Sequence, residues 1–83
     1  MQAPRPTFEV DGAAIRKIRM SRGVPIADLA RRTGITPSYL SRLETGVRRN
    51  MRPPKYEALR EALGLPPDTT QLLAVSEDRH PPR

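Results

Sequence analysis

Cysteine and tryptophan are absent from this sequence of 83 residues, which contains only one phenylalanine, two tyrosines and one histidine. Without cysteine, a disulfide bond and a thiolate metal ligand are both excluded. The single histidine, His80, stands near the end of the sequence and has no second histidine with which to share a metal. Catalysis needs a nucleophile, a base or metal ligands that converge on one point. This composition therefore predicts a protein that is not an enzyme and that binds no metal and no cofactor.

Long hydrophobic runs are also missing. No stretch of about 18 apolar residues is present, which excludes a membrane-spanning helix. The first residues include Arg5, but no apolar segment of the kind found in secretion signals accompanies it. We therefore expect a cytoplasmic protein that has no membrane partner.

Negative charge is scarce in the middle of the sequence. Residues 11–65 contain twelve Arg or Lys and five Asp or Glu, a balance of +7. Residues 1–10 are balanced, and residues 66–83 carry a net charge of −1. A basic surface concentrated on a small domain favours a polyanionic partner, because binding to phosphates releases condensed counterions. The charge thus favours nucleic acid, although a basic surface can also serve solubility alone.

Capping residues, prolines and glycines divide the sequence into short helices. Asp11 and Thr36 are typical N-cap residues, and Pro25 and Pro37 suit the first turn of a helix. Apolar residues at helical spacing predict five helices, at about residues 11–22, 25–33, 37–44, 55–63 and 67–75. No segment has the pattern of a strand. The sequence predicts an all-α fold, a compact five-helix bundle over residues 11–75, with an extended N-terminal arm (1–10) and a flexible C-terminal tail (76–83).

Residues 26–46 are the most informative block of the sequence. Ala30 and Gly34 are followed by Leu40 and Leu43, at a spacing that lets two short helices pack at a steep angle. Gly34 can adopt the positive φ that the tight turn requires. Ala30 is small enough for the place where the two helices cross. One face of the second helix is then free, which is the arrangement that enters the major groove of DNA.

On these residues the sequence resembles the phage-repressor and Cro type of helix-turn-helix protein, the XRE family. Three further motifs stand in the order expected of that family, LA at 29–30, SRLETG at 41–46 and ALGL at 62–65. The resemblance covers about residues 13–75 and implies a lambda-repressor-like fold. It also implies that the helix at about 37–44 binds double-stranded DNA.

The resemblance assigns roles to individual positions. Base contacts are implied for Thr36, Pro37, Ser38 and Arg42. DNA-backbone contacts are implied for Tyr39 and Ser41, and the positive charge adds Arg22, Arg31, Arg32, Arg48, Arg49 and Arg52. Arg42 is the strongest candidate for base readout, because a guanidinium can bond to guanine O6 and N7 together. Arg19 and Glu44 match a structural ion pair of the family.

Two departures from the family concern DNA contacts. Family members usually have Ser or Thr and then Gln where this sequence has Pro25 and Ile26, and Ile26 cannot donate a hydrogen bond to phosphate. Pro37 replaces a polar residue that faces the groove. We therefore expect affinity to depend mainly on the arginines.

These observations predict a bacterial or phage transcriptional regulator that is repressor-like and binds a near-palindromic site as a homodimer. Leu72, Leu73 and Val75, in the last predicted helix, are the expected apolar dimer surface. The alternative is an antitoxin or another protein-interaction module on the same fold, which would have a protein partner.

Overall fold

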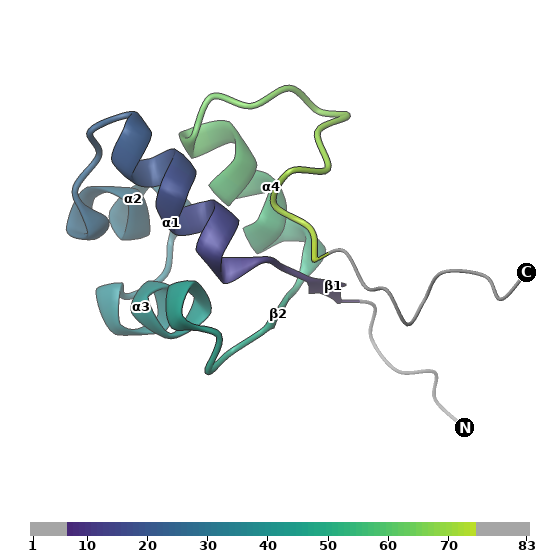
Figure 1. Cartoon of the computed structure of the whole chain (residues 1–83), viewed down its shortest axis with the longest axis horizontal. Coiled ribbons are helices and arrows are strands. Elements are labelled where there is room, and N and C mark those ends of the chain that lie inside the picture. Colours follow the sequence, from purple (N-terminus) through teal and green to yellow (C-terminus); the bar gives the residue numbers. More distant parts are fainter. Residues whose placement is uncertain (1–6, 75–83) are drawn as a thin grey trace, which may run out of the picture.

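The computed structural model describes residues 7–74. Within this range the chain forms four helices and two short strands (Figure 1). In chain order they are β1 (Phe8–Glu9), α1 (Gly12–Ser21), α2 (Ile26–Thr33), α3 (Pro37–Thr45), β2 (Asn50–Met51) and α4 (Pro53–Ala62). A mostly helical fold is thus confirmed, but the count of five helices is not.

The helix boundaries follow the predicted capping residues. The Asp11 carboxylate accepts a hydrogen bond from the backbone N–H of Ala14 at 3.2 Å, and the Thr36 hydroxyl accepts one from Tyr39 at 3.0 Å. Each side chain satisfies an amide of the first turn that has no partner within its helix. Gly34 ends α2 with a φ of +81°, which a residue with a Cβ adopts only under strain. The turn between α2 and α3 is therefore encoded locally.

The helices enclose one hydrophobic core. Helix α2 packs against both α3 and α4, and α1 packs against α3. The buried apolar residues are Val10, Ile15, Leu29, Ala30, Leu40, Leu43, Met51, Tyr56, Leu59, Leu63, Leu65 and Leu72. Ala30 has no exposed surface, as its predicted place at the helix crossing requires. This core fixes α3 in the domain while one face of that helix remains outside it.

The prediction that no segment forms a strand is wrong. Strand β1 pairs antiparallel with β2, with Phe8 opposite Met51 and Glu9 opposite Asn50. Val10 is buried in the core. The end of the expected N-terminal arm, residues 7–10, therefore packs on the domain, and residues 1–6 lie outside the described residues. Strands of two residues are too short to show an alternating pattern in the sequence.

The predicted helix at 67–75 is also wrong over the residues that the structure describes. This segment contains turns, and Leu73 forms an antiparallel bridge with Val10. Thr69 and Thr70 favour non-helical conformations, and pairing with residues 9–11 supplies the backbone hydrogen bonds that a helix would otherwise provide.

The expected dimer surface changes with this segment. Leu72 has no exposed surface, and Leu73 is half-buried against the core. Leu72 therefore cannot serve as a dimer contact in this fold. Val75 and the predicted tail 76–83 lie outside the described residues. Between residues 7 and 74, no helix has the length and apolar character needed to cross a membrane.

Candidate nucleic-acid interface

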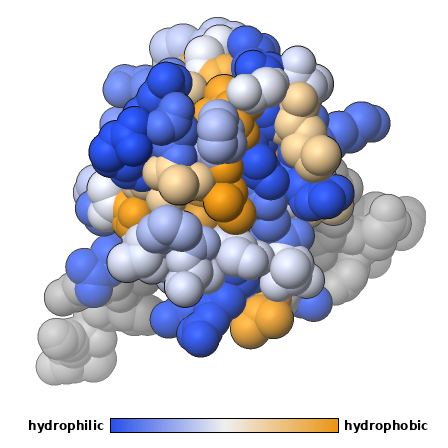
Figure 2. Space-filling model, turned by 90° about the vertical axis from the view of Figure 1, so that its left-hand side faces the viewer, coloured by the Kyte–Doolittle hydropathy of each residue, from blue (hydrophilic) through white to orange (hydrophobic). Residues whose placement is uncertain are grey.

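Helix α3 has one face in the core and one face in solvent. Leu40, Leu43 and Glu44 are buried. The exposed positions of the helix are Pro37, Ser38, Ser41, Arg42 and Thr45. Figure 2 shows the side of the molecule on which α2 and α3 lie, where hydrophilic side chains surround a narrow hydrophobic seam. The packing of α3 therefore presents a polar, partly basic face to the outside.

An ion pair fastens the buried side of α3 to α1. Arg19 Nε donates to Glu44 Oε2 at 2.7 Å, and a second guanidinium nitrogen donates to Oε1 at 3.1 Å. A third donates to the Val24 carbonyl at 3.0 Å. Hydrogen bonding to the carboxylate raises the pKa of Arg19 above its ordinary value. The pair that the resemblance implied between Arg19 and Glu44 is present and joins the two helices.

Arg42 stands on the exposed face of α3 without a competing partner. Its side chain makes no hydrogen bond or ion pair with any residue between 7 and 74, so its guanidinium is free to bind a ligand. Ser38 is exposed one turn earlier. Thr36 uses its oxygen to cap the helix, which leaves its hydroxyl hydrogen free to donate outward. Pro37 offers only its ring.

The segment from residue 47 to residue 52, here called the basic loop, connects α3 to α4. The guanidinium of Arg48 lies 5.4 Å from the centre of the Tyr39 ring, within the range of a cation–π contact. Arg49 lies 4.0 Å from the Glu9 carboxylate, and both side chains are exposed, so this pair is weak. The positive charges of the loop therefore remain accessible to an external anion.

Tyr39 has a role that the sequence did not suggest. Its hydroxyl donates to the Asn50 carbonyl at 3.2 Å, which joins α3 to strand β2. A phosphate oxygen can only accept a hydrogen bond from this group. The expected contact of Tyr39 with the DNA backbone would therefore require the bond to Asn50 to be released, whereas its present geometry supports the loop.

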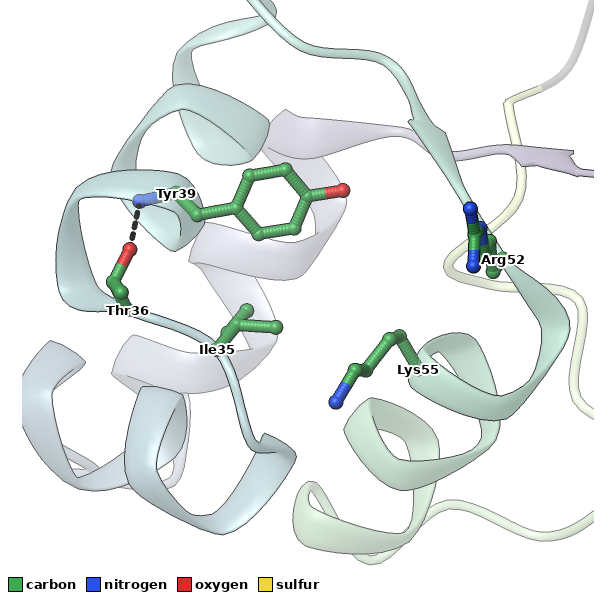
Figure 3. Close-up of a pocket in the computed structure, with 5 residues that line it drawn as sticks. All are labelled: Ile35, Thr36, Tyr39, Arg52 and Lys55. Carbon is green, nitrogen blue, oxygen red and sulfur yellow. Dashed lines mark hydrogen bonds between the residues drawn. The ribbon is translucent and has the colours of Figure 1, made fainter.

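An open hollow of about 400 Å³ lies between the start of α3 and the start of α4, lined by Ile35, Thr36, Tyr39, Arg52 and Lys55 (Figure 3). Lys55 extends across it, and its ammonium donates to the Gly34 carbonyl at 3.1 Å. Lys55 is not among the residues that the sequence predicts for the site. Its position in the first turn of α4, directly after the basic loop, was the available signal. The hollow brings two positive charges to the edge of α3.

Three further predicted backbone contacts lie on α2 and at the C-cap of α1. Arg31 and Arg32 are exposed and share Asp28 of their own helix as an ion-pair partner. Arg22 lies beside Gly64, at the turn after α4, with a guanidinium nitrogen 3.3 Å from where a Cβ of Gly64 would be. That turn and α3 occupy opposite edges of the molecule in Figure 1. The structure therefore separates Arg22 from α3.

Ile26 explains one departure from the family pattern. Ile26 is half-buried and packs against the core, and Pro25, the N-cap residue of α2, makes no side-chain hydrogen bond. The first residue of α2 thus contributes to packing instead of presenting a polar group. No group of three or more potential metal ligands occurs within residues 7–74.

Comparisons with known proteins agree with this geometry. A family model described as a helix-turn-helix domain matches residues 12–73. Uncharacterised HTH-type transcriptional regulators of Mycobacterium tuberculosis and Mycobacterium bovis are 43% identical to the chain over 70 residues, which is 84% of this chain and 27% of each relative. The chain thus spans about a quarter of the length of these relatives.

Two solved structures are similar as well. The clp gene regulator ClgR from Corynebacterium glutamicum has 35% identity and a TM-score of 0.61, over 65% of this chain and 56% of that chain. The master regulator for biofilm formation SinR, solved in complex with DNA, has 27% identity and a TM-score of 0.62, over 66% of this chain and 90% of that chain.

Proposed function

The chain belongs to the helix-turn-helix domain family, of the phage-repressor and Cro (XRE) type, and from this premise we propose that it binds duplex DNA and regulates transcription. Helix α3 enters the major groove and the basic loop lies along the adjacent phosphates. The relatives are named as transcriptional regulators, and SinR was solved in complex with DNA. Both findings support this function.

One observation carries the proposal most directly. The exposed face of α3 holds an arginine that has no partner among residues 7–74, while Leu40 and Leu43 fix the opposite face of the helix in the core. An α-helix fits the major groove, which is about 12 Å wide. A helix held in this way can approach base edges without any rearrangement of the domain.

Reading of the bases falls to the first two turns of α3. Arg42 is proposed to bond to guanine O6 and N7, which discriminates against a wrong base by about 1–3 kcal/mol. Thr36 and Ser38 can each donate one hydrogen bond, and Pro37 can only make apolar contact. The base-reading set is therefore small, and this limits the number of positions that the domain specifies.

Binding to the backbone falls to the groups around α3. Arg48, Arg49 and Arg52 of the basic loop, together with Lys55, form a basic border on the α4 side of the helix. Ser41, Arg31 and Arg32 are exposed and supply further donors. Such contacts set affinity and register, while base contacts set specificity.

A single α3 covers only a half-site, so we propose that two copies bind a near-palindromic site and that the protein acts as a repressor. Selection of bound duplexes from a random pool tests this directly. The selected sequences should show a two-fold repeat with half-sites about 34–36 Å apart, one helical turn of DNA, or a multiple of this distance. Selected sites without a repeat would contradict the dimer.

Two variants separate base reading from backbone binding. Arg42→Ala should lose about 1–3 kcal/mol of preference for the selected site over random duplex. Arg49→Ala should weaken both duplexes alike and make the slope of log K against log salt shallower by about 0.9. Equal losses on both duplexes for Arg42→Ala would contradict base readout. If the unmodified protein binds no duplex at about 50 mM salt, the alternative of a protein-interaction module, such as an antitoxin, is favoured.

A further inference from the structure

Strand β1 pairs with the end of the basic loop. Besides the register of Phe8 with Met51 and of Glu9 with Asn50, the amide of Val10 donates to the Arg49 carbonyl at 2.8 Å. A backbone carbonyl in the middle of the basic loop is thereby fixed by a residue that lies 39 positions earlier in the chain. The loop is held from outside as well as by its two ends.

A ring contact ties β1 to α4. The rings of Phe8 and Tyr56 meet edge to face, with centroids 4.9 Å apart and planes at 75°. Phe8 is 37% exposed and is the only phenylalanine of the chain. Packing in the core does not account for a large apolar side chain that remains partly in solvent. The position of Phe8 is explained if this side chain keeps β1 against α4.

The basic loop needs such support because few contacts of its own restrain it. Val47 is 73% exposed, and Arg48 and Arg49 are exposed as well. From α3 the loop receives the Tyr39 hydroxyl on the Asn50 carbonyl and the hydrogen bond from the Arg48 amide to the Arg42 carbonyl. Burial of Met51 in the core and pairing with strand β1 hold the end of the loop. A loop ordered before binding loses less conformational entropy when it meets the phosphates.

The opposite edge of β1 is occupied by the C-terminal segment. The amide of Asp11 donates to the Leu72 carbonyl at 2.8 Å, and the amide of Ala74 donates to the Glu9 carbonyl at 3.0 Å. Residues 72–74, β1 and β2 thus lie side by side, with β1 in the middle. A change in β1 reaches both the basic loop and the C-terminal segment through backbone hydrogen bonds.

We propose that β1, anchored by Phe8, is a positioning element that holds the arginines of the basic loop in place for the DNA backbone, and that it couples this loop to residues 72–74. The inference rests on the proposed function, because it assigns to β1 a role in DNA affinity. Phe8 itself makes no contact with DNA in this arrangement. It acts through the loop.

The test compares Phe8→Ala with two controls in the full chain. Phe8→Tyr keeps the aromatic ring, and Met20→Ala removes another large apolar side chain that is 54% exposed and lies on α1. Phe8→Ala should flatten the salt dependence of DNA binding. For each phosphate that the loop no longer neutralises, the ratio of Kd at ~200 mM to Kd at ~50 mM salt should fall about 3.5-fold. The preference for the selected site over random duplex should be unchanged, and both controls should behave like the unmodified protein.

Hydrogen exchange supplies a readout that does not require DNA. In the free protein, Phe8→Ala should speed amide exchange at Val10, Arg48 and Ala74 by about twofold to tenfold, the range expected when an aromatic pair is removed. Exchange in the core of α3, at Leu43, should not change. A variant that merely destabilised the whole domain would speed all four amides and would keep the original salt slope.

The outcomes separate the two proposals. An unchanged salt slope for Phe8→Ala on a protein that binds DNA, or unchanged exchange at Arg48 in the free protein, overturns the role of β1 and leaves the proposed function intact. Absence of duplex binding by the unmodified protein refutes the proposed function, and with it the contribution of β1 to DNA affinity. Slower exchange at Ala74 on addition of the selected duplex supports the coupling of the C-terminal segment to the loop.

Discussion

The ion pair between Arg19 and Glu44 should contribute strongly to folding stability, because both groups are nearly enclosed. The side chain of Arg19 is 13% exposed and that of Glu44 is 4% exposed. Exposed ion pairs contribute little, but a charge left alone after its partner is removed from a buried pair costs about 3–5 kcal/mol. Two hydrogen bonds join the guanidinium to the carboxylate, and a third binds it to the Val24 carbonyl.

The two single variants should therefore differ. Arg19→Met leaves the carboxylate of Glu44 unpaired where it is almost fully buried, and should cost about 3–5 kcal/mol. Glu44→Leu leaves Arg19 charged, but this side chain retains the Val24 carbonyl and can turn toward solvent, so the cost should be about 2–3 kcal/mol. The double variant should be no less stable than Glu44→Leu alone, so the coupling energy should be at least the cost of Arg19→Met, about 3 kcal/mol.

Urea unfolding followed by the helical circular dichroism signal measures all four proteins, and thermal unfolding provides a second measure. A loss of about 2 kcal/mol in a domain of this size should lower Tm by at least about 8 °C. The reasoning would be refuted if the stability losses of the two single variants simply added in the double variant, or if each single variant lost less than about 0.5 kcal/mol. Such results would mean that Arg19 and Glu44 interact no more strongly than an exposed pair and that α3 is held by its apolar contacts alone.

Two further predictions concern stability. Gly12→Ala should cost at least about 2 kcal/mol in urea unfolding, because a Cβ at this position would lie 1.9 Å from the Leu43 carbonyl oxygen. The control Ala13→Ser, at an exposed position of the same helix, should change stability by less than about 0.5 kcal/mol. Equal losses of stability in the two variants would contradict close packing of α1 on α3. Burial raises the pKa of Tyr56, so the unfolded chain loses this proton first and stability should fall as the pH rises above about 10. Tyr56→Phe should lose less stability than the unmodified protein between about pH 8 and pH 11. The same alkaline loss in this variant and in the unmodified protein would exclude Tyr56 as its source.

The helices could be predicted because their boundaries depend on neighbouring residues. Asp11 and Thr36 cap amides three positions ahead of them, and Gly34 accepts the positive φ of a turn that it forms itself. Each of these boundaries involves a few consecutive residues. The periodic apolar positions Leu40 and Leu43 then determined which face of α3 is buried, and therefore which face is exposed.

The strands and the end of the domain could not be predicted in the same way. Phe8 pairs with Met51, and Val10 pairs with Leu73, so the partners are more than 40 residues apart. The two leucines at 72 and 73 suggested a helical stripe, but Leu72 is a core residue whose backbone pairs with Asp11. Contacts of this kind depend on which surfaces remain unpaired once the core has formed. A short window of sequence does not contain that information.

The candidate site was predictable where exposure alone defined it and not where two elements meet. The exposed position of Arg42 followed from the helical period, whereas the hydrogen bond of Tyr39 to Asn50 and the position of Lys55 across the turn required the fold. Arg22 shows the opposite error, since a basic residue close to the helix-turn-helix in sequence lies beside Gly64 in space. The net charge predicted a polyanionic partner but could not show how the contacts with that partner are distributed among the basic residues.

That distribution bears on how this domain would hold DNA. Ile26 packs against the core where a polar side chain would grip the backbone from the α2 side of the helix-turn-helix. On the α4 side, Arg52 and Lys55 line a hollow that opens beside the start of α3. Positive charge is thus available across α3 from the polar side chain that α2 lacks at its first residue, on a border that β1 helps to order. Because phosphate contacts set the register of a recognition helix, anchoring from the α4 side should determine which turn of α3 lies deepest in the groove.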